Sequence, residues 1–366
     1  KNKMKYLDSA IEDFDRAIAL APENYVVYWV RGMVKAVQND VEGAFADYNK
    51  AIELNPKCVE AYYNRAKLYG SLKDNANTIK DLDKALQLKP DDYASYFVRA
   101  ASKKNTGDLD GAIKDLTACL RLNPSYEDAY IFRATVKFLR NDINGAIEDY
   151  TKAIQLAPDD YDAYFNRGNA RFKKRDFTAA MEDYNAAIRL KGDEPLFYVT
   201  LGNTKDQLGD SEGAMLDYGK AIQIDPDCRD AYYNRGIARR NKNDFAGAIE
   251  DYTRAIQIQP DFADAYFRRA MAKKENNDYA GAIEDFSIAL ETDPNHVQAV
   301  GERAMAREQT GDYDGAIEDY TVFLRFQPKN PNAYYHRALS REQKEDLKGA
   351  LEDISKAIQL QPDDMQ

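Results

Sequence analysis

Histidine, cysteine and long apolar runs are scarce in this 366-residue sequence. Its two histidines, His296 and His336, have no partner at metal-binding spacing, so we predict no metal site. Its three cysteines, Cys58, Cys119 and Cys228, are too few and too scattered for a disulfide framework, which favours a reducing compartment such as the cytoplasm. No stretch reaches the roughly 18 apolar residues that a membrane span needs, and no signal peptide is visible. We therefore expect no membrane association.

Positive charge is also in deficit. The chain has 51 Lys and Arg against 62 Asp and Glu, which gives a net charge of −11. Nucleic-acid binding needs a basic face to meet the phosphates, so we exclude nucleic acid as a partner. No glycine-rich phosphate loop is present, and Cys119 stands where we expect a small buried side chain and not a nucleophile. The sequence thus predicts neither an enzyme nor a bound cofactor.

A 34-residue period dominates what the sequence does contain. Ten full repeats occupy residues 25–364, and a partial repeat, residues 1–24, precedes them. We number each full repeat from 1 to 34, so that Tyr25 is position 1 of the first. Proline stands at position 32 of every full repeat except one, which has Gly192, and at the equivalent position of the partial repeat. These prolines are Pro22, Pro56, Pro90, Pro124, Pro158, Pro226, Pro260, Pro294, Pro328 and Pro362.

Each repeat reads as two helices. In residues 229–262, small and apolar residues at positions 3, 4 and 8 form the inner stripe of a first helix. Asn243 tolerates the left-handed backbone that ends a helix, and Asp244 at position 16 is suited to cap the next one. Asp stands at position 16 in all ten repeats: Asp40, Asp74, Asp108, Asp142, Asp176, Asp210, Asp244, Asp278, Asp312 and Asp346.

These repeats strongly resemble the tetratricopeptide repeat (TPR) family over essentially the whole chain. The family has an aromatic residue at position 4, a small residue at 8, Ala at 20, an aromatic at 24, Ala at 27 and Pro at 32. Here these are Tyr232, Gly236, Ala248, Tyr252, Ala255 and Pro260. The resemblance implies an all-α, right-handed superhelical solenoid of antiparallel helix pairs, a single array over residues 1–366, whose first helices line a concave groove. Stacking of neighbours stabilises such an array, because one pair cannot bury its own apolar face.

Charged residues also repeat. Position 23 is Asp in every full repeat, position 11 is Lys or Arg in all but one, where it is Tyr69, and position 7 is Arg in all but one, where it is Leu201. We predict an interhelical ion pair in which Arg235 and Arg239 bracket Asp251, because a planar guanidinium can meet a carboxylate with two hydrogen bonds. The alternative is a ladder of arginines that binds a ligand.

The groove positions implied by the resemblance, 2, 5, 6, 9, 12 and 13, are where we look for a binding site. Position 5 is aromatic in seven repeats, which indicates packing between neighbouring first helices or a partly exposed aromatic track. Asparagine donates and accepts hydrogen bonds, so a row of asparagines suits the backbone of an extended peptide; the alternative is solvated polar surface. The candidate residues are Phe165, Asn166, Asn169, Phe172, Lys173, Asn203, Tyr233, Asn234, Arg240, Asn241, Phe267 and Arg268.

One binding mode known in the family fails on these residues. Some TPR co-chaperones hold the acidic C-terminus of heat-shock proteins with a clamp of Lys, Asn and Arg. Asn203, Asn234 and Arg268 match three of its places, but Val199 and Asp264 stand where the clamp needs lysine. Position 2 is acidic or uncharged in all ten repeats. We therefore expect a protein or peptide partner that is basic or neutral and not acidic.

Residues 195–228 form an atypical repeat. It has Gly192 before it in place of proline, Leu201 in place of arginine, and a displaced Pro195. Such departures indicate sequence drift, a hinge or a binding feature. The array also starts and stops without a polar capping helix, which suggests a larger protein or self-association through the ends. Besides a peptide-binding scaffold, the sequence therefore leaves open a recruiting arm of a larger enzyme and a self-associating structural array.

Overall fold

The computed structural model describes residues 2–361, and these contain helices but no strand. They fall into two compact units, with the boundary between Leu190 and Lys191, just before the atypical repeat. Unit one contains α1 (Asn2–Leu20), α2 (Tyr25–Val37), α3 (Val41–Leu54), α4 (Val59–Ser71), α5 (Asn75–Leu88), α6 (Tyr93–Asn105), α7 (Leu109–Leu122), α8 (Glu127–Leu139), α9 (Ile143–Leu156), α10 (Tyr161–Lys173) and α11 (Phe177–Leu190). Unit two contains α12 (Pro195–Gln207), α13 (Ser211–Ile224), α14 (Arg229–Asn241), α15 (Phe245–Ile258), α16 (Ala263–Glu275), α17 (Tyr279–Thr292), α18 (Val297–Thr310), α19 (Tyr313–Phe326), α20 (Pro331–Gln343) and α21 (Leu347–Leu360).

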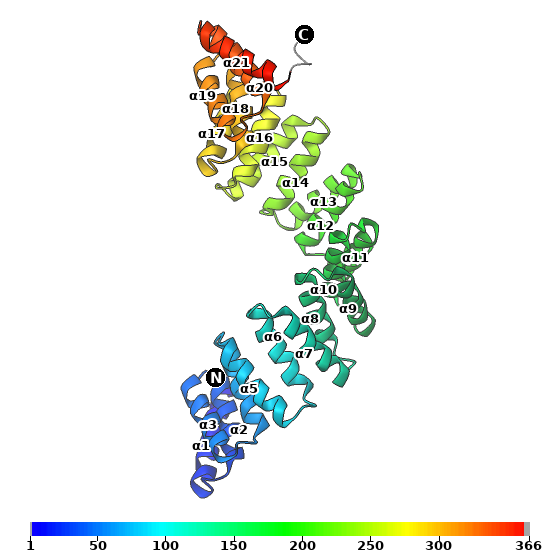
Figure 1. The fold of residues 1–366 in the computed structure, drawn as a ribbon. Helices are drawn as coiled ribbons and strands as arrows, with labels where there is room; N and C mark the ends of the chain where they lie inside the picture. The colour runs from blue at the N-terminus through cyan, green and yellow to red at the C-terminus, as the bar shows by residue number, and fades with distance from the viewer. Residues whose placement is uncertain (1, 362–366) are drawn as a thin grey trace. The chain divides into compact units, whose positions relative to one another are not determined.

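In each unit the helices pack in chain order (Figure 1). Even-numbered helices are the first helices of the repeats, and each packs against the second helix of its own repeat and the second helix of the repeat before it in the same unit. Neighbouring first helices also touch, as α14 and α16 do. The predicted all-α solenoid of helix pairs is confirmed. Pro362 and the end of the last repeat lie outside the described residues, and the union of both units into a single array stays a prediction.

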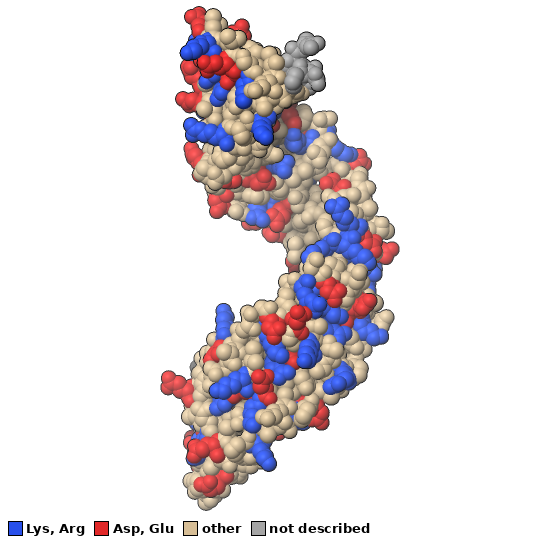
Figure 2. Space-filling view, in the orientation of Figure 1, with Lys and Arg blue, Asp and Glu red and all other residues tan. Residues whose placement is uncertain are grey.

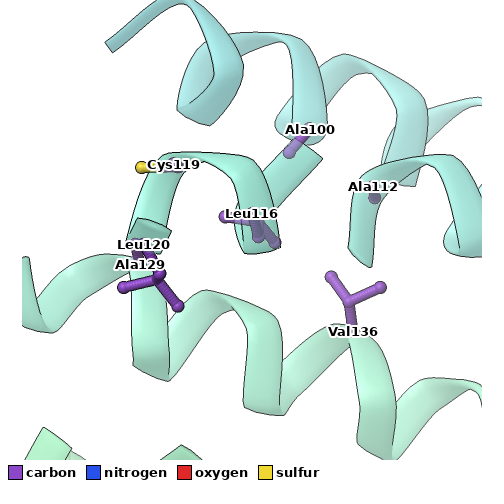
Figure 3. Packing of buried hydrophobic residues seen from close by; sticks show 7 residues of the cluster. All are labelled: Ala100, Ala112, Leu116, Cys119, Leu120, Ala129 and Val136. Atoms are coloured by element: carbon purple, nitrogen blue, oxygen red, sulfur yellow. The ribbon is translucent and has the colours of Figure 1, made fainter. Parts of the chain in front are cut away.

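Small side chains let the helices approach closely. Figure 3 shows one such cluster in unit one, where α6, α7 and α8 meet. The predicted core position of Cys119 is confirmed, because its side chain is fully buried there. Close packing of this kind makes each helix depend on its neighbours, because a volume change in one cluster is felt by all the helices that share it. The cluster consists of Ala100, Ala112, Leu116, Cys119, Leu120, Ala129 and Val136.

The turn between the two helices of a repeat follows the sequence pattern. The Asp at position 16 accepts a hydrogen bond from the backbone N–H three residues later in all ten repeats. The residue before it, position 15, has a φ between 60° and 84° in all ten. Seven of these residues are not glycine, and they include Lys73, Arg175 and Glu345. These three lie in a backbone region that side chains with a Cβ rarely adopt.

Lys73→Gly is therefore expected to stabilise unit one by about 1 kcal/mol, because glycine adopts a positive φ without the steric cost of a Cβ. The midpoint of urea denaturation measures this change. The reverse substitution at the same position of the next repeat, Gly107→Lys, serves as the control and is expected to lower the midpoint by a similar amount. Equal midpoints for both variants and the wild type would contradict the expectation.

Candidate functional site

The predicted ion pair is present in every repeat that has an arginine at position 7. The Nε and Nη2 of each arginine donate to the two carboxylate oxygens of Asp at position 23, at 2.5–3.0 Å. Arg239 Nη1 lies 3.0 Å from the same carboxylate of Asp251, as predicted. The hydrogen bonds to Asp251 raise the pKa of Arg235 despite its burial. In the atypical repeat, Asp217 keeps one cation, Lys205, at 2.7 Å.

The arginines make a further contact that sequence reasoning missed. In eight repeats, Nη1 donates to the side chain at position 25 of the preceding repeat, so one guanidinium joins three helices. The signal was present in the sequence, because these residues all carry an acceptor oxygen. With their donors used inside the protein, these arginines have a structural role and do not form a ligand ladder. The acceptors are Asp15, Asn49, Asp83, Thr117, Thr151, Thr253, Ser287 and Thr321.

In unit one, the predicted groove residues Phe165, Asn166, Asn169, Phe172 and Lys173 lie together on α10. Asn169 Oδ1 accepts a hydrogen bond from the hydroxyl of Tyr184 at 2.9 Å. The ring of Phe172 packs edge-on against Phe177, and Lys173 Nζ lies 4.8 Å from the ring centre of Phe138. The ring of Phe165 also packs against Tyr184. Four of the five residues thus make contacts within unit one that the sequence did not reveal.

In unit two, the predicted residues come from α12, α14 and α16. Asn203 Oδ1 accepts from the Tyr218 hydroxyl at 2.8 Å and from Asn234 Nδ2 at 3.0 Å, so the two predicted asparagines do meet. The hydroxyl of Tyr233 donates to Asp264 of the next first helix. The asparagine row is therefore partly a structural network, in which Asn203 has no acceptor capacity to spare in the direction of the groove.

The remaining predicted residues of unit two differ in exposure. Arg240 pairs with Glu275, with Nε 2.7 Å from Oε2, whereas Asn241 is exposed. Phe267 is only 6% exposed and packs against the ring of His296 at 4.5 Å. The other position-5 aromatics are half-buried, apart from Tyr335. Phe165, Tyr233 and Phe267 contact the ring at position 24 of their own repeat, and Phe97 contacts Phe132 on the next first helix.

A hollow of about 390 Å³ lies among α14, α16 and α18, and we call it the groove hollow. Gly301 on α18 stands at position 5, where seven repeats have an aromatic residue. Phe323 on α19 stands at position 27, where the other repeats have a small residue. A Cβ on Gly301 would lie 2.9 Å from the ring of Phe323, so the aromatic ring enters from the second helix and leaves space on the first. The hollow is lined by Arg240, Phe267, Arg268, Met271, Gln298, Gly301, Glu302, Met305 and Phe323.

Arg268 lines this hollow, and its buried Nε has no hydrogen-bond partner among the described residues. The hydroxyl of Tyr252 on α15 is also buried and unpaired among them. In three other repeats the tyrosine at position 24 bonds to Thr or Asn at position 9, but here Ile237 stands at that position. Burial raises the pKa of Tyr252, which keeps its hydroxyl protonated. Unpaired buried donors are costly, so each of these two atoms lacks an acceptor that would stabilise it.

The groove positions of unit two have a surplus of negative charge. On α12, α14, α16, α18 and α20, positions 2, 5, 6, 9, 12 and 13 hold three cations and seven carboxylates. On the face drawn in Figure 2, by contrast, acidic and basic side chains are interspersed over each unit. The groove charges are Arg240, Arg268, Lys274, Asp206, Asp230, Asp264, Glu275, Glu302, Glu308 and Glu342.

One histidine in this groove is predicted to make the stability of unit two pH-dependent. His336 Nδ1 lies 3.2 Å from Glu308 Oε2, and this hydrogen bond raises the pKa of His336 although burial opposes it. Because the pKa of His336 is higher in the folded protein than its ordinary value of 6.5, protonation of His336 stabilises the folded state. This stabilisation is complete below pH 6.5 and is lost as the pH rises through the pKa of the folded protein. The thermal midpoint of His336→Gln should thus fall below that of the wild type at pH 5.5 and approach it at pH 8.5. A difference in thermal midpoint between His336→Gln and the wild type that widens with pH would contradict this. Glu308→Gln, which removes the partner carboxylate, serves as the matched variant.

The stacked helix pairs define an α-helical repeat protein, and comparison with known families names the class. A family model described as TPR repeat matches residues 32–73, 134–174 and 202–241. Models described as tetratricopeptide repeat match residues 59–92, 93–126, 161–194, 230–262, 267–331 and 331–364. The chain belongs to the tetratricopeptide repeat family. Members of this family bind protein or peptide partners and are generally non-catalytic, so the chain is a protein-interaction scaffold.

Several solved structures have a similar fold. A C-terminal part of a TPR repeat-containing protein from Cytophaga hutchinsonii is 18% identical, with a TM-score of 0.58, and the match covers 66% of this chain and 98% of that one. A tetratricopeptide repeat protein from Parabacteroides merdae is 15% identical, with a TM-score of 0.51, covering 73% and 98%. YrrB, described as a TPR protein with an unusual peptide-binding site, is 20% identical, with a TM-score of 0.44, covering 50% and 95%. At these identities the likeness shows the fold alone. No curated protein sequence gives a significant match.

None of the helices in residues 2–361 combines the length and the apolar character that crossing a membrane would need.

Proposed function

We propose that the groove of unit two binds an extended segment of a partner protein and that the groove hollow receives one of its side chains. The observation that carries this proposal is the buried Arg268 Nε, a donor without a partner among the described residues, whose side chain lines the groove hollow. A carbonyl oxygen of a peptide backbone would supply the missing acceptor after a rotation of the Arg268 side chain.

The lining of the groove hollow indicates which side chain it takes. Phe267 and Phe323 provide apolar walls, and Met271 and Met305 are flexible side chains that adapt to different shapes. An apolar side chain of the partner therefore fits best. The exposed amide of Asn241 and the free amide oxygen of Asn234 are available to the neighbouring peptide backbone.

The charge of the groove selects the rest of the segment. Seven carboxylates against three cations repel an acidic peptide and favour one that is basic or neutral. In unit one, the exposed Lys173 and the polar Asn166 on α10 form a second candidate surface for the same kind of partner.

Selection of peptides from a phage-displayed random library on the full chain tests this proposal. Met271→Trp fills the groove hollow and is expected to weaken those selected peptides that bind in the groove at least about tenfold in Kd. The matched control is Met33→Trp, which changes the same repeat position on α2 of unit one and should leave Kd unchanged.

Arg268→Gln is expected to weaken the same peptides, because it removes the unpaired Nε donor near the hollow. Circular dichroism should show that all three variants stay folded. The proposal is overturned if no selected peptide is weakened by Met271→Trp and left unchanged by Met33→Trp, or if the peptides that Met271→Trp weakens prefer acidic residues.

A further inference from the structure

A second hollow lies in the atypical repeat, away from the residues of the groove hollow. Its volume is about 670 Å³, and it lies between α13 and α14. We call it the Gly219 hollow. Its lining includes Met215, Leu216, Gly219, Lys220, Arg235 and Arg239.

Two departures from the repeat pattern meet at this hollow. Position 25 supplies the acceptor for the next arginine in eight other cases, but here it is Gly219. Position 22 is Lys or Glu in eight of the ten repeats, but here it is Leu216, whose side chain is 76% exposed. Both changes are locally unfavourable, because glycine weakens a helix interior by about 1 kcal/mol and an exposed leucine gains nothing from burial.

Arg235 is the arginine that loses its third contact. Its Nε and Nη2 still hold Asp251, at 2.9 and 2.7 Å. Among the described residues, Nη1 has no acceptor, and a Cβ on Gly219 would lie 3.8 Å from it. In the other repeats the side chain at position 25 fills the space beside this Nη1, whereas here that space is part of the Gly219 hollow.

Elsewhere in the chain six of the eight acceptors at this position are neutral and two are carboxylates. A carboxylate is favoured here, because Arg235 and Arg239 share the single charge of Asp251 and Lys220 adds a third cation. Three cations line the hollow, namely Lys220, Arg235 and Arg239, and its one lining carboxylate, Glu212, pairs with Lys242 at 2.6 Å. The chain itself shows the fitting geometry elsewhere. In unit one, Asp83 stands at the position equivalent to Gly219, and its carboxylate accepts a hydrogen bond of 2.7 Å from Arg99 Nη1.

We propose that the Gly219 hollow is a docking site for an acidic side chain of a partner protein. The carboxylate of the partner accepts the hydrogen bond from Arg235 Nη1 that Gly219 leaves unmade, and an adjacent apolar side chain of the partner covers Leu216 and Met215. The site accounts for both local departures at once, because each removes a side chain that would otherwise fill or repel the partner. It selects acidic segments, whereas the groove of unit two favours basic or neutral ones.

The test selects peptides from a phage-displayed random library on the immobilised full chain. Free Gly219→Asp variant is added in solution to remove peptides that bind elsewhere on the protein. Gly219→Asp restores the acceptor that Asp83 provides in unit one, so it should fold normally and close the site from within. We expect the selected peptides to contain Asp or Glu beside an apolar residue, and to lose at least about tenfold in Kd on Gly219→Asp and on Leu216→Glu.

Two controls separate this site from the groove. Gly219→Ala adds a methyl group but no acceptor, and Met271→Trp changes only the groove hollow, so both should leave Kd unchanged. Amidation of the acidic residue in the peptide should weaken binding to the wild type by the same tenfold, and added salt should weaken it too. The proposal is overturned if no selected peptide depends on Gly219, if the peptides prefer hydroxyl or amide residues, or if Gly219→Asp binds them as well as the wild type does.

Discussion

Asp251→Ala is expected to lower the free energy of unfolding of the α14–α15 region by about 3–5 kcal/mol. The carboxylate of Asp251 is 3% exposed and holds both Arg235 and Arg239, so its removal leaves two half-buried guanidinium groups without an anion. The cost comes from the stranded charges and not from the loss of a net stabilising bond, since a complete buried ion pair contributes little by itself.

Native-state hydrogen exchange of the amides in α14 and α15 measures this loss locally, which suits a repeat protein whose units do not open together. Asp217→Ala is the matched control, because Asp217 holds only Lys205. Burial raises the pKa of Asp217 although Lys205 opposes the shift, so this carboxylate is the less well compensated of the two. The flexible side chain of Lys205 can reach water, and we expect a clearly smaller loss. Equal losses at the two sites would show that the number of stranded cations is irrelevant.

The second large effect is expected from Gly301 and Phe323, which exchange roles relative to the other repeats. Gly301→Phe should destabilise unit two by about 3 kcal/mol through overpacking, because even a Cβ would lie 2.9 Å from the ring of Phe323. Phe323→Ala should cost about 3 kcal/mol through the cavity that it leaves. The double variant restores the usual aromatic at position 5 and alanine at position 27, and should recover most of the sum of the two losses.

Urea denaturation of the four proteins in this double-mutant cycle gives the coupling energy between the two positions. The double variant moves the aromatic ring from α19 to α18 and so changes two residues that line the groove hollow, and it should therefore lose the groove peptides while regaining stability. Additive losses, with no recovery in the double variant, would mean that the two rings do not occupy a common space. A double variant that is stable and still binds the groove peptides would count against the groove hollow as their site.

Much of the fold followed from short-range signals repeated with a constant period. The capping Asp244, the turn at Asn243 and the 3.6-residue stripe of each helix act within a few residues, so any one repeat shows them. The ion pair of Arg235 with Asp251 could also be predicted, because both residues recur in step and the resemblance places their helices side by side. Ten aligned copies removed the ambiguity that a single copy leaves.

The candidate binding residues were less predictable, because their partners lie on other repeats. Asn203 meets Asn234 across 31 residues, and Tyr233 meets Asp264 across the same distance. Whether such side chains face a ligand or each other depends on how neighbouring first helices are spaced and rotated, which no local pattern specifies. Several predicted groove residues therefore proved to be partly structural.

The sequence by itself determined the repeat, its two helices, their caps and the ion pair between them, because each of these depends on residues at fixed and repeated separations. Only the tertiary structure decided where the repeats leave space. Gly301 leaves space on α18 because the ring of Phe323 reaches it from α19. Gly219 lies in another hollow, where it faces Arg235 Nη1 and supplies no acceptor for it. A departure from the repeat creates a site only through the group that faces it across the helix interface, and that group is defined by packing in three dimensions.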